Sequence, residues 1–462
     1  MARSGGPTVG LDIGSCNIKA VEIVPGRGGN TVRALGMIAT PPDVIENGII
    51  IDPQQLGQAV KTLLKDSGIS SKNSVSSVSG QSALVVRVIE VPQMSDSELA
   101  ETMRYEVERH VPFAANEVIM DFQPIHRADT ADDAANMEVL LAVAQQDMID
   151  KHVEMLFAAG LTPSAIDVEP LAVARTYIEL TPDPLGQKTV AIVNIGHLNT
   201  DIAIFRDGIL SFPRVLPLAG TSFTRSIMGH MGMSQDQAEE YKKTYAEVIM
   251  QHGSAPAQQA AADPGFLDFS APPTLGDDSG AKMPFDFSEP SDTEPTNLAM
   301  AAAAEAGGVD PFGIPGDSPF GEPIGADTAP ALTTTASSET HDPNKLQVFT
   351  AIAPVIGELL TEVRRSMEYY QGRGLGAIDE ILLCGGSANI TNMDTFFTSE
   401  LGIPTRLASP FEHVTVAAKS YSPEYLEGVS SQFAVAVGLA VRDMVSVKMP
   451  VPAGGKKRGK KK

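Results

Sequence analysis

Apolar residues recur along the chain in two periods that predict strands and helices. Alternation at every second residue, with many β-branched side chains, predicts strands at 9–23, 74–79, 83–91, 116–125 and 137–144. The first of these segments predicts a hairpin with its turn from Gly14 to Asn17. Apolar residues three or four apart predict helices at 53–66, 95–109 and 147–159. Ser95 and Glu98 have the spacing of a capping box, and Gly160 ends the third helix.

The second half of the chain repeats the strand pattern and then turns helical. Residues 187–205 begin another run of adjacent strands, and 221–249 predict largely helical structure. Residues 345–370 predict a helix with one apolar face, which Pro354 either kinks or interrupts. A strand at 380–384 runs into a glycine turn and a helix, and the last apolar helix is predicted near 431–445. With 462 residues, this α/β pattern predicts two or more domains.

Between the halves, residues 251–344 have a different composition. They are rich in Ala, Pro, Gly, Ser and Asp, and fifteen acidic residues oppose the single Lys282, a net charge of −14 within the −23 of the whole chain. Such a segment buries too little apolar area to offset the entropy lost on ordering, so we expect a disordered insert. Its Phe residues, spaced among Pro and Asp, serve either as short docking motifs or as parts of a plain spacer.

Charge and cysteine content exclude several functions. A net charge of −23 argues against a general nucleic-acid binder, which needs clustered Lys and Arg. Cys16 and Cys384 lack metal-ligand spacing and are expected to be reduced thiols. We find neither a signal-peptide pattern nor an apolar run approaching the roughly 20 residues of a membrane span, so we expect a cytoplasmic protein. The basic tail 447–462 either attracts the chain weakly to an anionic membrane surface or only keeps its end soluble.

Three glycine-bearing turns carry the candidate chemistry. Segments 12–15 (DIGS) and 194–197 (NIGH) each end a strand and open a hairpin, whereas 385–388 (GGSA) lies between a strand and a helix. Glycine in the first two turns lets backbone N–H groups approach phosphate oxygens closely. A carboxylate such as that of Asp12 can hold a hydrated Mg²⁺ against those phosphates. The paired glycines of the third turn leave room for a base and a ribose.

The order of these turns resembles the actin-like ATPase superfamily. LDIGSCNIK resembles its first phosphate loop, and VNIGHLNTDIAIF resembles its second. EPLAVA at 169–174 and FAVAVGLAV at 433–441 resemble the two connecting helices, LCGGSANI the adenosine loop, and AEEYK at 238–242 the helix that approaches the ribose. The resemblance implies an actin-like ATPase fold of two βα lobes that bind ATP and Mg²⁺.

A set of site residues follows from this resemblance. Glu169 would orient the attacking water, Asn194 would stand at the acid that usually starts the second phosphate loop, and Asp12 would hold Mg²⁺ through water. The implied nucleotide-binding residues are Asp12, Gly14, Ser15, Cys16, Asn17, Lys19, Gly196, His197, Asn199, Thr200, Glu239, Lys242, Gly385, Gly386, Ser387 and Gly438.

Two departures from the superfamily pattern weigh against hydrolysis. The amide of Asn194 can neither act as a base nor give a full charge to Mg²⁺. In addition, residues 197–199 (HLN) replace the glycine-rich turn of active relatives. We therefore expect ATP binding with slow or absent hydrolysis. His197 either acts as an acid or simply contacts phosphate or solvent, and Lys19 points either to phosphate or to solvent.

An inserted unit makes the chain similar to the PilM family. Residues 82–160 predict strand–helix–strand–strand–helix, which resembles the 1C (SHS2-like) subdomain of FtsA and PilM. YEVERHVPFAANEVIMDFQPI and RRSMEYY resemble PilM segments, and the chain ends in lysines rather than in the amphipathic helix of FtsA. The implied organisation is lobe 1 at 8–81, 161–187 and 429–446, the 1C unit at 82–160, lobe 2 at 188–250 and 345–428, the insert at 251–344, and the tail at 447–462.

The PilM resemblance implies an ATP-binding adaptor for type IV pilus assembly and twitching motility. Its partner would be the cytoplasmic N-terminus of PilN, bound in a groove of subdomains 1A and 1C at the cytoplasmic face of the inner membrane. Through the PilN–PilO complex it would reach the pilus motor ATPases indirectly, with only peripheral membrane association. Two alternatives stay open: an enzyme, as a steady ATPase or a sugar-kinase-like phosphotransferase, and a filament-forming, FtsA-like cytoskeletal protein.

Overall fold

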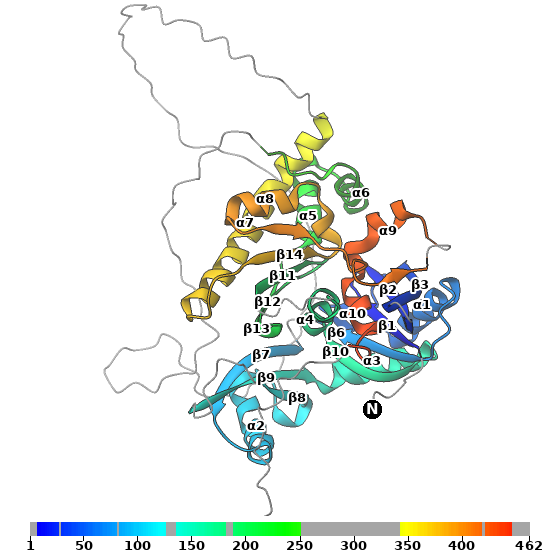
Figure 1. Ribbon diagram of the computed structural model, residues 1–462. Coiled ribbons are helices and arrows are strands. Elements are labelled where there is room, and N and C mark those ends of the chain that lie inside the picture. The colour runs from blue at the N-terminus through cyan, green and yellow to red at the C-terminus, as the bar shows by residue number, and fades with distance from the viewer. Residues whose placement is uncertain are drawn as a thin grey trace, which may run out of the picture. The chain divides into compact units, whose positions relative to one another are not determined.

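The computed structural model describes residues 7–26, 29–80, 83–125, 135–181, 188–250, 342–417 and 421–445. The predicted insert as far as residue 341 and the basic tail lie outside the described residues. Within these residues the chain forms sixteen strands and ten α-helices, numbered in chain order, and Figure 1 labels those for which there is room. The strands are β1 (Thr8–Ile13), β2 (Asn17–Gly26), β3 (Gly29–Ala39), β4 (Ile45–Glu46), β5 (Ile49–Ile50), β6 (Asn73–Val78), β7 (Leu84–Pro92), β8 (Val118–Ile125), β9 (Asn136–Gln145), β10 (Thr162–Val168), β11 (Thr189–Ile195), β12 (Thr200–Arg206), β13 (Ile209–Leu216), β14 (Glu380–Cys384), β15 (Thr405–Leu407) and β16 (Thr415–Val416).

Helices follow groups of these strands, and α5, α6 and α7 are consecutive along the described chain. The α-helices are α1 (Pro53–Asp66), α2 (Asp96–His110), α3 (Gln146–Ala158), α4 (Glu169–Ala174), α5 (Gly220–Met231), α6 (Gln235–Tyr245), α7 (Pro343–Gly372), α8 (Met393–Leu401), α9 (Pro423–Val429) and α10 (Ala434–Ala440). Three short 3₁₀-helices and one π-helix complete them: η1 (Ala115–Glu117), η3 (Gly386–Asn389), η4 (Ser430–Phe433) and the π-helix η2 (Arg175–Glu179).

The first large sheet has the strand order β10-β6-β1-β2-β3-β16. Strands β1 and β2 form the predicted antiparallel hairpin, while β1 and β10 both run parallel to β6, which lies between them. Parallel strands end at the same edge of a sheet, so the residues that follow β1, β6 and β10 come together there. This edge therefore collects the end of the first glycine turn and the start of α4.

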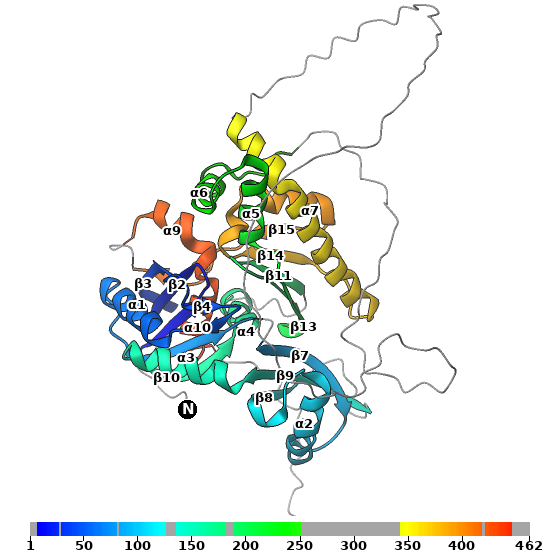
Figure 2. The same cartoon turned by 180° about the vertical axis from the view of Figure 1, so that it is seen from behind.

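Helices cover both faces of this sheet. On one face α1 and α3 lie side by side, and Leu56 and Val60 share a buried cluster with Met155 and Leu156 (Figure 2). On the other face α10 lies so close to β1 that a Cβ on Gly10 would stand 2.1 Å from the carbonyl oxygen of Ala436. Glycine is required at that position because any side chain would push the helix away from the strand.

The second large sheet has the order β13-β12-β11-β14-β15. Its main buried cluster joins β11 and β12 to α5, α7 and α8, with Phe223, Ile352 and Phe397 fully buried. Helix α7 continues through Pro354, so the proline does not break it. The predicted helical stretch 221–249 is two helices, because Gly232 adopts a left-handed conformation with φ of 65° and ends α5.

Within the described residues α7 is the one helix long and apolar enough to cross a membrane. By length and composition, α7 is thus a candidate membrane span, which the pattern of apolar residues did not predict. However, its apolar side chains pack into the core of the second sheet, from Val348 at one end to Tyr370 at the other. A core helix meets the same criteria, so this is weak evidence for a membrane span.

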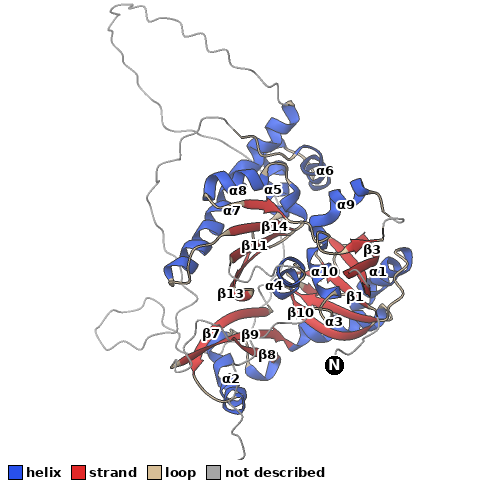
Figure 3. Cartoon of the chain, in the orientation of Figure 1, coloured by secondary structure: helices blue, strands red, loops and turns tan. Residues whose placement is uncertain are grey.

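A three-stranded antiparallel sheet, β7-β9-β8, forms the unit predicted before Gly160 (Figure 3). Helix α2 covers one face through Leu99, Met103 and Val107. The capping box predicted at Ser95 and Glu98 is present in both directions. The order strand–helix–strand–strand–helix is confirmed, and the last helix, α3, packs against α1.

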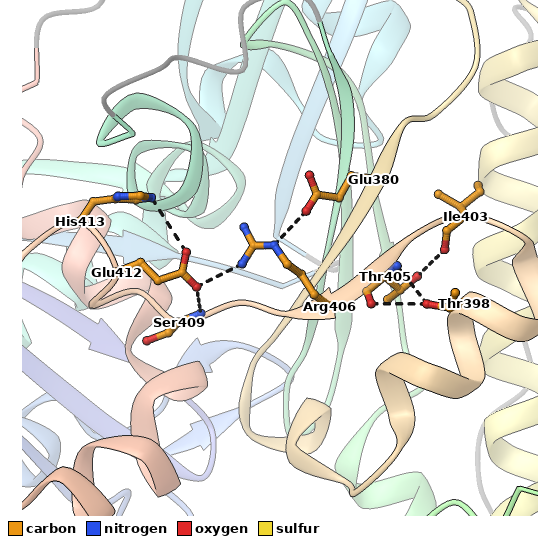
Figure 4. A network of polar contacts seen from close by, with 8 residues as sticks. All are labelled: Glu380, Thr398, Ile403, Thr405, Arg406, Ser409, Glu412 and His413. Atoms are coloured by element: carbon orange, nitrogen blue, oxygen red, sulfur yellow. Dashed lines mark hydrogen bonds and ion pairs between the residues drawn. The ribbon is translucent and has the colours of Figure 1, made fainter.

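Two crossings join the large sheets. At the first, α4 and α10 are in contact, and a Cβ on Gly438 would lie 1.8 Å from the carbonyl oxygen of Ala172. At the second, the chain leaves β15 and passes to β16 through a loop that polar contacts hold in place (Figure 4). Arg406 on β15 binds Glu380 at 2.8 Å and Glu412 in the loop at 3.1 Å. The Tyr177 hydroxyl donates to the carbonyl of Ala408, which ties the loop to η2.

Candidate functional site

The two large sheets present hairpin turns of matching geometry. In the first, the Gly14 N–H donates to the carbonyl of Asn17 at 3.2 Å, and in the second the Gly196 N–H donates to the carbonyl of Asn199 at 3.0 Å. A Cβ on either glycine would stand 2.7 or 2.8 Å from that same carbonyl oxygen. Glycine is therefore the residue that permits both turns, as the sequence predicts.

A cavity of about 620 Å³ lies between these turns. Nucleotide-sized ligands occupy pockets of roughly 300–1,000 Å³, so its size fits the implied ligand. The glycine turns supply backbone N–H groups without side chains in the way, which suits the phosphates of a nucleotide. The predicted residues that line it are Asp12, Gly14, Ser15, Cys16, Asn17, Lys19, Glu169, Asn194, Gly196, His197, Asn199, Glu239, Lys242, Gly385, Gly386 and Ser387.

Two predicted residues do not line the cavity. Thr200 is fully buried, and its hydroxyl donates to the carbonyl of Leu218 at 2.6 Å. Gly438 lies in α10, where it permits the close contact with α4 described above. Both residues therefore support the walls of the site from behind.

The first turn carries an ion pair. The Lys19 ammonium lies 2.8 Å from the Asp12 carboxylate, across the β1–β2 hairpin. In this structure Lys19 therefore points to Asp12, and not to solvent. The turn is fixed from the side as well, because the Thr40 hydroxyl donates to the carbonyl of Gly14 at 2.6 Å.

Carboxylates concentrate at the centre of the cavity. Burial and the charge of Asp12 raise the pKa of Asp201 to about 7. Burial, then the charges of Asp201 and Asp12, raise the pKa of Glu169 well above its usual range, while a hydrogen bond from Ser79 and the charge of Lys19 act in the opposite direction. Crowded carboxylates of this kind are stabilised by a cation, so the donor set fits Mg²⁺.

The described side chains are not arranged to coordinate a metal ion directly. Among the residues that the structure describes, no three His, Cys, Asp or Glu side chains are grouped closely enough to hold a metal ion. A metal held through its water shell, as predicted for Asp12, is compatible with that spacing. The ion would supply charge neutralisation for phosphates, and the carboxylates would orient its waters.

Asp201 is the main site residue that the sequence prediction omitted. It lines the cavity and lies directly opposite Asn194 in the β11–β12 pairing, as Lys19 lies opposite Asp12 in β1–β2. Its place seven residues after Asn194 repeats the spacing of Lys19 from Asp12, and that spacing was the available signal. At the second turn, an amide (Asn194) thus stands where a carboxylate is expected, but Asp201 opposite it supplies a carboxylate.

Helix α6 contributes a polar cluster to the same wall. Lys242 donates to Glu239 at 2.7 Å and to the carbonyl of Gly220 at 3.0 Å, and Thr224 donates to Glu239 at 2.6 Å. Burial raises the pKa of Glu239, but its bonds to Lys242 and Thr224 outweigh that effect and lower it overall. Burial and the nearby charge of Lys242 lower the pKa of His197, so its imidazole is neutral at pH 7. A neutral imidazole is a poor proton donor, which favours a contact role over an acid role.

The third turn closes the cavity at the end of β14. Gly385 has φ of 92°, and a Cβ there would meet the carbonyl oxygen of Ile195 at 2.4 Å. The Ser387 hydroxyl donates to the carbonyl of Gly196 at 2.8 Å, which fixes the third turn to the second. Ser431 in η4 donates to the carbonyl of Gly385 at 3.1 Å. The second phosphate turn and the predicted adenosine turn are thus directly connected.

The root of the insert forms part of the same wall. Thr244, Ala246 and Thr391 line the cavity, and the Val248 N–H donates to the carbonyl of Thr391 at 2.9 Å. Lys345, just after the insert, lies 2.6 Å from Glu247, just before it. Described residues on either side of the insert, Glu247 and Lys345, are therefore joined beside the cavity.

Comparison with known proteins agrees with this architecture. The family model described as "Type IV pilus assembly protein PilM" matches residues 10–248 and 340–444. The chain is 25% identical over 256 residues to the cell division protein FtsA of Bacillus subtilis (strain 168), covering 51% of this chain and 57% of that protein. It is also 25% identical over 267 residues to FtsA of Pseudomonas aeruginosa PAO1, covering 53% and 62%. The match thus spans less than two thirds of either curated relative.

Among solved structures, a chain of the "PilM-PilN type IV pilus biogenesis complex" is similar with a TM-score of 0.68. The similarity covers 95% of this chain and 99% of that chain at 24% identity, which shows a shared fold. The predicted α/β fold of the actin-like ATPases is thereby confirmed. The chain belongs to the type IV pilus assembly protein PilM family, which is related to FtsA within the actin-like ATPases.

Proposed function

We propose that this chain is an ATP-binding adaptor of type IV pilus assembly in which the nucleotide serves as a conformational ligand. The observation that carries the proposal is the cavity between two matching glycine turns, one from each large sheet. A ligand that contacts both turns favours the arrangement that brings them together. Binding thereby shifts the population toward one conformation without requiring chemistry.

The site chemistry supports binding more strongly than rapid turnover. Asn194 supplies an amide where a carboxylate is expected, and the neutral His197 occupies the second turn. Asp201 and Glu169 remain beside the phosphate turns and favour slow residual hydrolysis of ATP in the presence of Mg²⁺. Phosphate release that stays at background supports the adaptor, whereas robust release favours the alternative of a steady ATPase.

The proposed partner is the cytoplasmic N-terminus of PilN. The solved relative is a complex of PilM with PilN. In this chain, Val86 and Leu140 lie on the face of the β7-β9-β8 sheet opposite α2 and pack against the buried cluster that contains Phe205 and Leu210. Val88 and Ala142 are half-buried on the same face. Ile119, on the same face at the β8 edge, remains 40% exposed. An extended apolar peptide fits along the β8 side of this face, where Ile119 is exposed, beside the proposed groove of subdomains 1A and 1C.

Calorimetric titration of a PilN N-terminal peptide, with and without ATP and Mg²⁺, tests the coupling. We expect tighter peptide binding in the presence of ATP, and equal affinities would exclude the conformational role. Ile119→Glu places a charge on the proposed face and should abolish binding. Tyr105→Glu on α2, where the side chain is 68% exposed, is the matched control and should bind normally.

The proposed location is the cytoplasmic face of the inner membrane, through PilN–PilO and, indirectly, the pilus motors. Fractionation of cells with and without PilN tests this location. We expect the chain to leave the membrane fraction when PilN is absent, and persistence there would indicate a direct attachment. ATP-dependent sedimentation of the purified chain would instead favour the filament-forming alternative.

A further inference from the structure

One buried hydroxyl in the cavity wall has no partner. Ser77 is 4% exposed and lines the cavity, yet its Oγ makes no hydrogen bond to any residue that the structure describes. This Oγ atom is shielded from bulk solvent. An unpaired buried polar group costs stability, so a hydroxyl retained at this position calls for a partner that binds there.

Strand pairing fixes what surrounds this hydroxyl. Ser76 pairs with Leu11 on β1, so Ser77 is level with Asp12, and Ser77 itself pairs with Asp167 on β10, two residues before Glu169. Strand β6 runs between β1 and β10. Ser77 therefore stands between the strand ends that carry Asp12 and Glu169, at the edge where the cavity opens.

Ser76 and Ser77 are neighbours on β6, but their side chains lie on opposite faces of the sheet. Successive side chains in a strand point to opposite faces. Ser76 points to α3, where its hydroxyl is hydrogen-bonded to the Nε2 of His152 at 2.8 Å. Ser77 consequently points to the opposite face, the one that α10 covers. Ser79, two residues further on that side, hydrogen-bonds Glu169.

We propose that Ser77 is a positioning residue for bound ATP: its hydroxyl hydrogen-bonds a water molecule held between Asp12 and Glu169 at the terminal phosphate. Rotation about χ1 turns the Oγ from the wall toward the cavity, since serine has three accessible staggered rotamers. Ser77 then satisfies its hydroxyl through the ligand's hydration shell, and Ser79 keeps Glu169 aimed at the same water. This inference rests on the proposed nucleotide binding.

The test compares two adjacent serines in the full-length chain. Ser77→Ala removes a hydroxyl that the ligand-free chain leaves unpaired, so its melting temperature should equal or exceed that of the wild type. Its affinity for ATP with Mg²⁺, measured by calorimetry, should fall about three- to tenfold, the effect of one neutral hydrogen bond. Affinity for ADP should change little, because ADP lacks the terminal phosphate.

Ser76→Ala is the matched control on the other face. It removes the bond to His152, so we expect a lower melting temperature and wild-type affinity for ATP. Wild-type affinity in Ser77→Ala would overturn the inference, as would a lowered melting temperature or an equal loss for ATP and ADP. Absence of ATP binding by the wild-type chain would instead refute the proposed function itself, so the two failures are distinguishable.

Discussion

Asn194 lies directly opposite Asp201 across the β11–β12 hairpin, and both side chains line the cavity. The equivalent positions of the β1–β2 hairpin hold the ion pair of Asp12 and Lys19. The first turn therefore has a carboxylate neutralised by an ammonium group, whereas the second has a carboxylate beside an amide. Asp201 thus lies near the negative charge of Asp12, and its own partner across the hairpin, Asn194, carries no positive charge.

Asn194→Asp is expected to raise phosphate release from ATP above the wild-type rate. The new carboxylate supplies a full charge for the water shell of Mg²⁺, which an amide does not. Release should be measured at saturating ATP with and without Mg²⁺. Asn136→Asp, which adds the same charge at the exposed start of β9, away from the cavity, should leave release at the wild-type level. An unchanged rate in Asn194→Asp would show that the amide is not what limits hydrolysis.

The stability of the ligand-free chain should fall as the pH rises toward 7, in part because of Asp201. The pKa of its side chain is raised to about 7 by burial and by Asp12, whereas an unfolded Asp titrates near about 4. The folded chain therefore binds this proton more tightly, and its contribution to stability is present at low pH and lost between those two values.

Melting temperatures of the ligand-free chain from pH 5 to pH 8 test that dependence. Asp201→Asn should melt at a higher temperature than the wild type at pH 8, with a smaller difference at pH 5. Asp66→Asn removes an exposed carboxylate at the end of α1 and is the control for the change of charge. A pH-independent difference for Asp201→Asn would contradict the raised pKa.

Tyr421→Phe is expected to destabilise the chain by about 1–3 kcal/mol. The Tyr421 hydroxyl accepts from the Leu35 N–H and donates to the Leu35 carbonyl, each at 2.9 Å, and so occupies the place of a strand partner on β3. Its removal leaves both backbone groups of Leu35 without that partner. Urea unfolding measures the loss. Tyr425→Phe, in the ring stacked on Tyr421, is the control and should change stability less.

Two helical glycines should respond to alanine with opposite signs. Gly438→Ala drives a methyl group into the Ala172 carbonyl and should destabilise the chain by about 1–3 kcal/mol or more. Gly357→Ala in α7 adds its methyl group in open space and should stabilise by about 0.5–1 kcal/mol. Urea unfolding of both variants measures the difference. Equal effects would mean that α4 and α10 have room to separate.

The sequence was sufficient for the turns because their chemistry is local. Gly14 and Gly196 each permit a contact with a residue three positions later, and Gly385 directly follows a strand with a positive φ, so spacing along the chain reveals these positions. Strands β3 and β10 were not predicted. In β3, Gly36 interrupts the alternation of apolar and polar residues, and a Cβ there would clash with Ser67. In β10, Pro163 at the second position weakens the local strand pattern. Both strands are selected by their neighbours in the sheet.

The contacts of side chains with residues far away in the chain could not be predicted from the sequence for a related reason. Lys19 was compatible with phosphate or solvent until the hairpin register placed it on Asp12. Gly438 was assigned to the nucleotide because its motif resembles a connecting helix, yet its neighbour is Ala172, 266 positions earlier in the chain. Contacts at such separations depend on the packing of α4 against α10, which no local pattern specifies.

The ion pair between Glu247 and Lys345 has a consequence for the length of the sequence between them. The ends of the segment between them are fastened by that ion pair and by the Val248–Thr391 hydrogen bond, on a wall already built by α6 and η3. Closing a longer loop across fixed ends costs only about 0.6 kcal/mol for each doubling of its length. A change in the length of the sequence between the two anchors should therefore cost little stability, while Glu247, Val248, Lys345 and Thr391 hold the cavity wall.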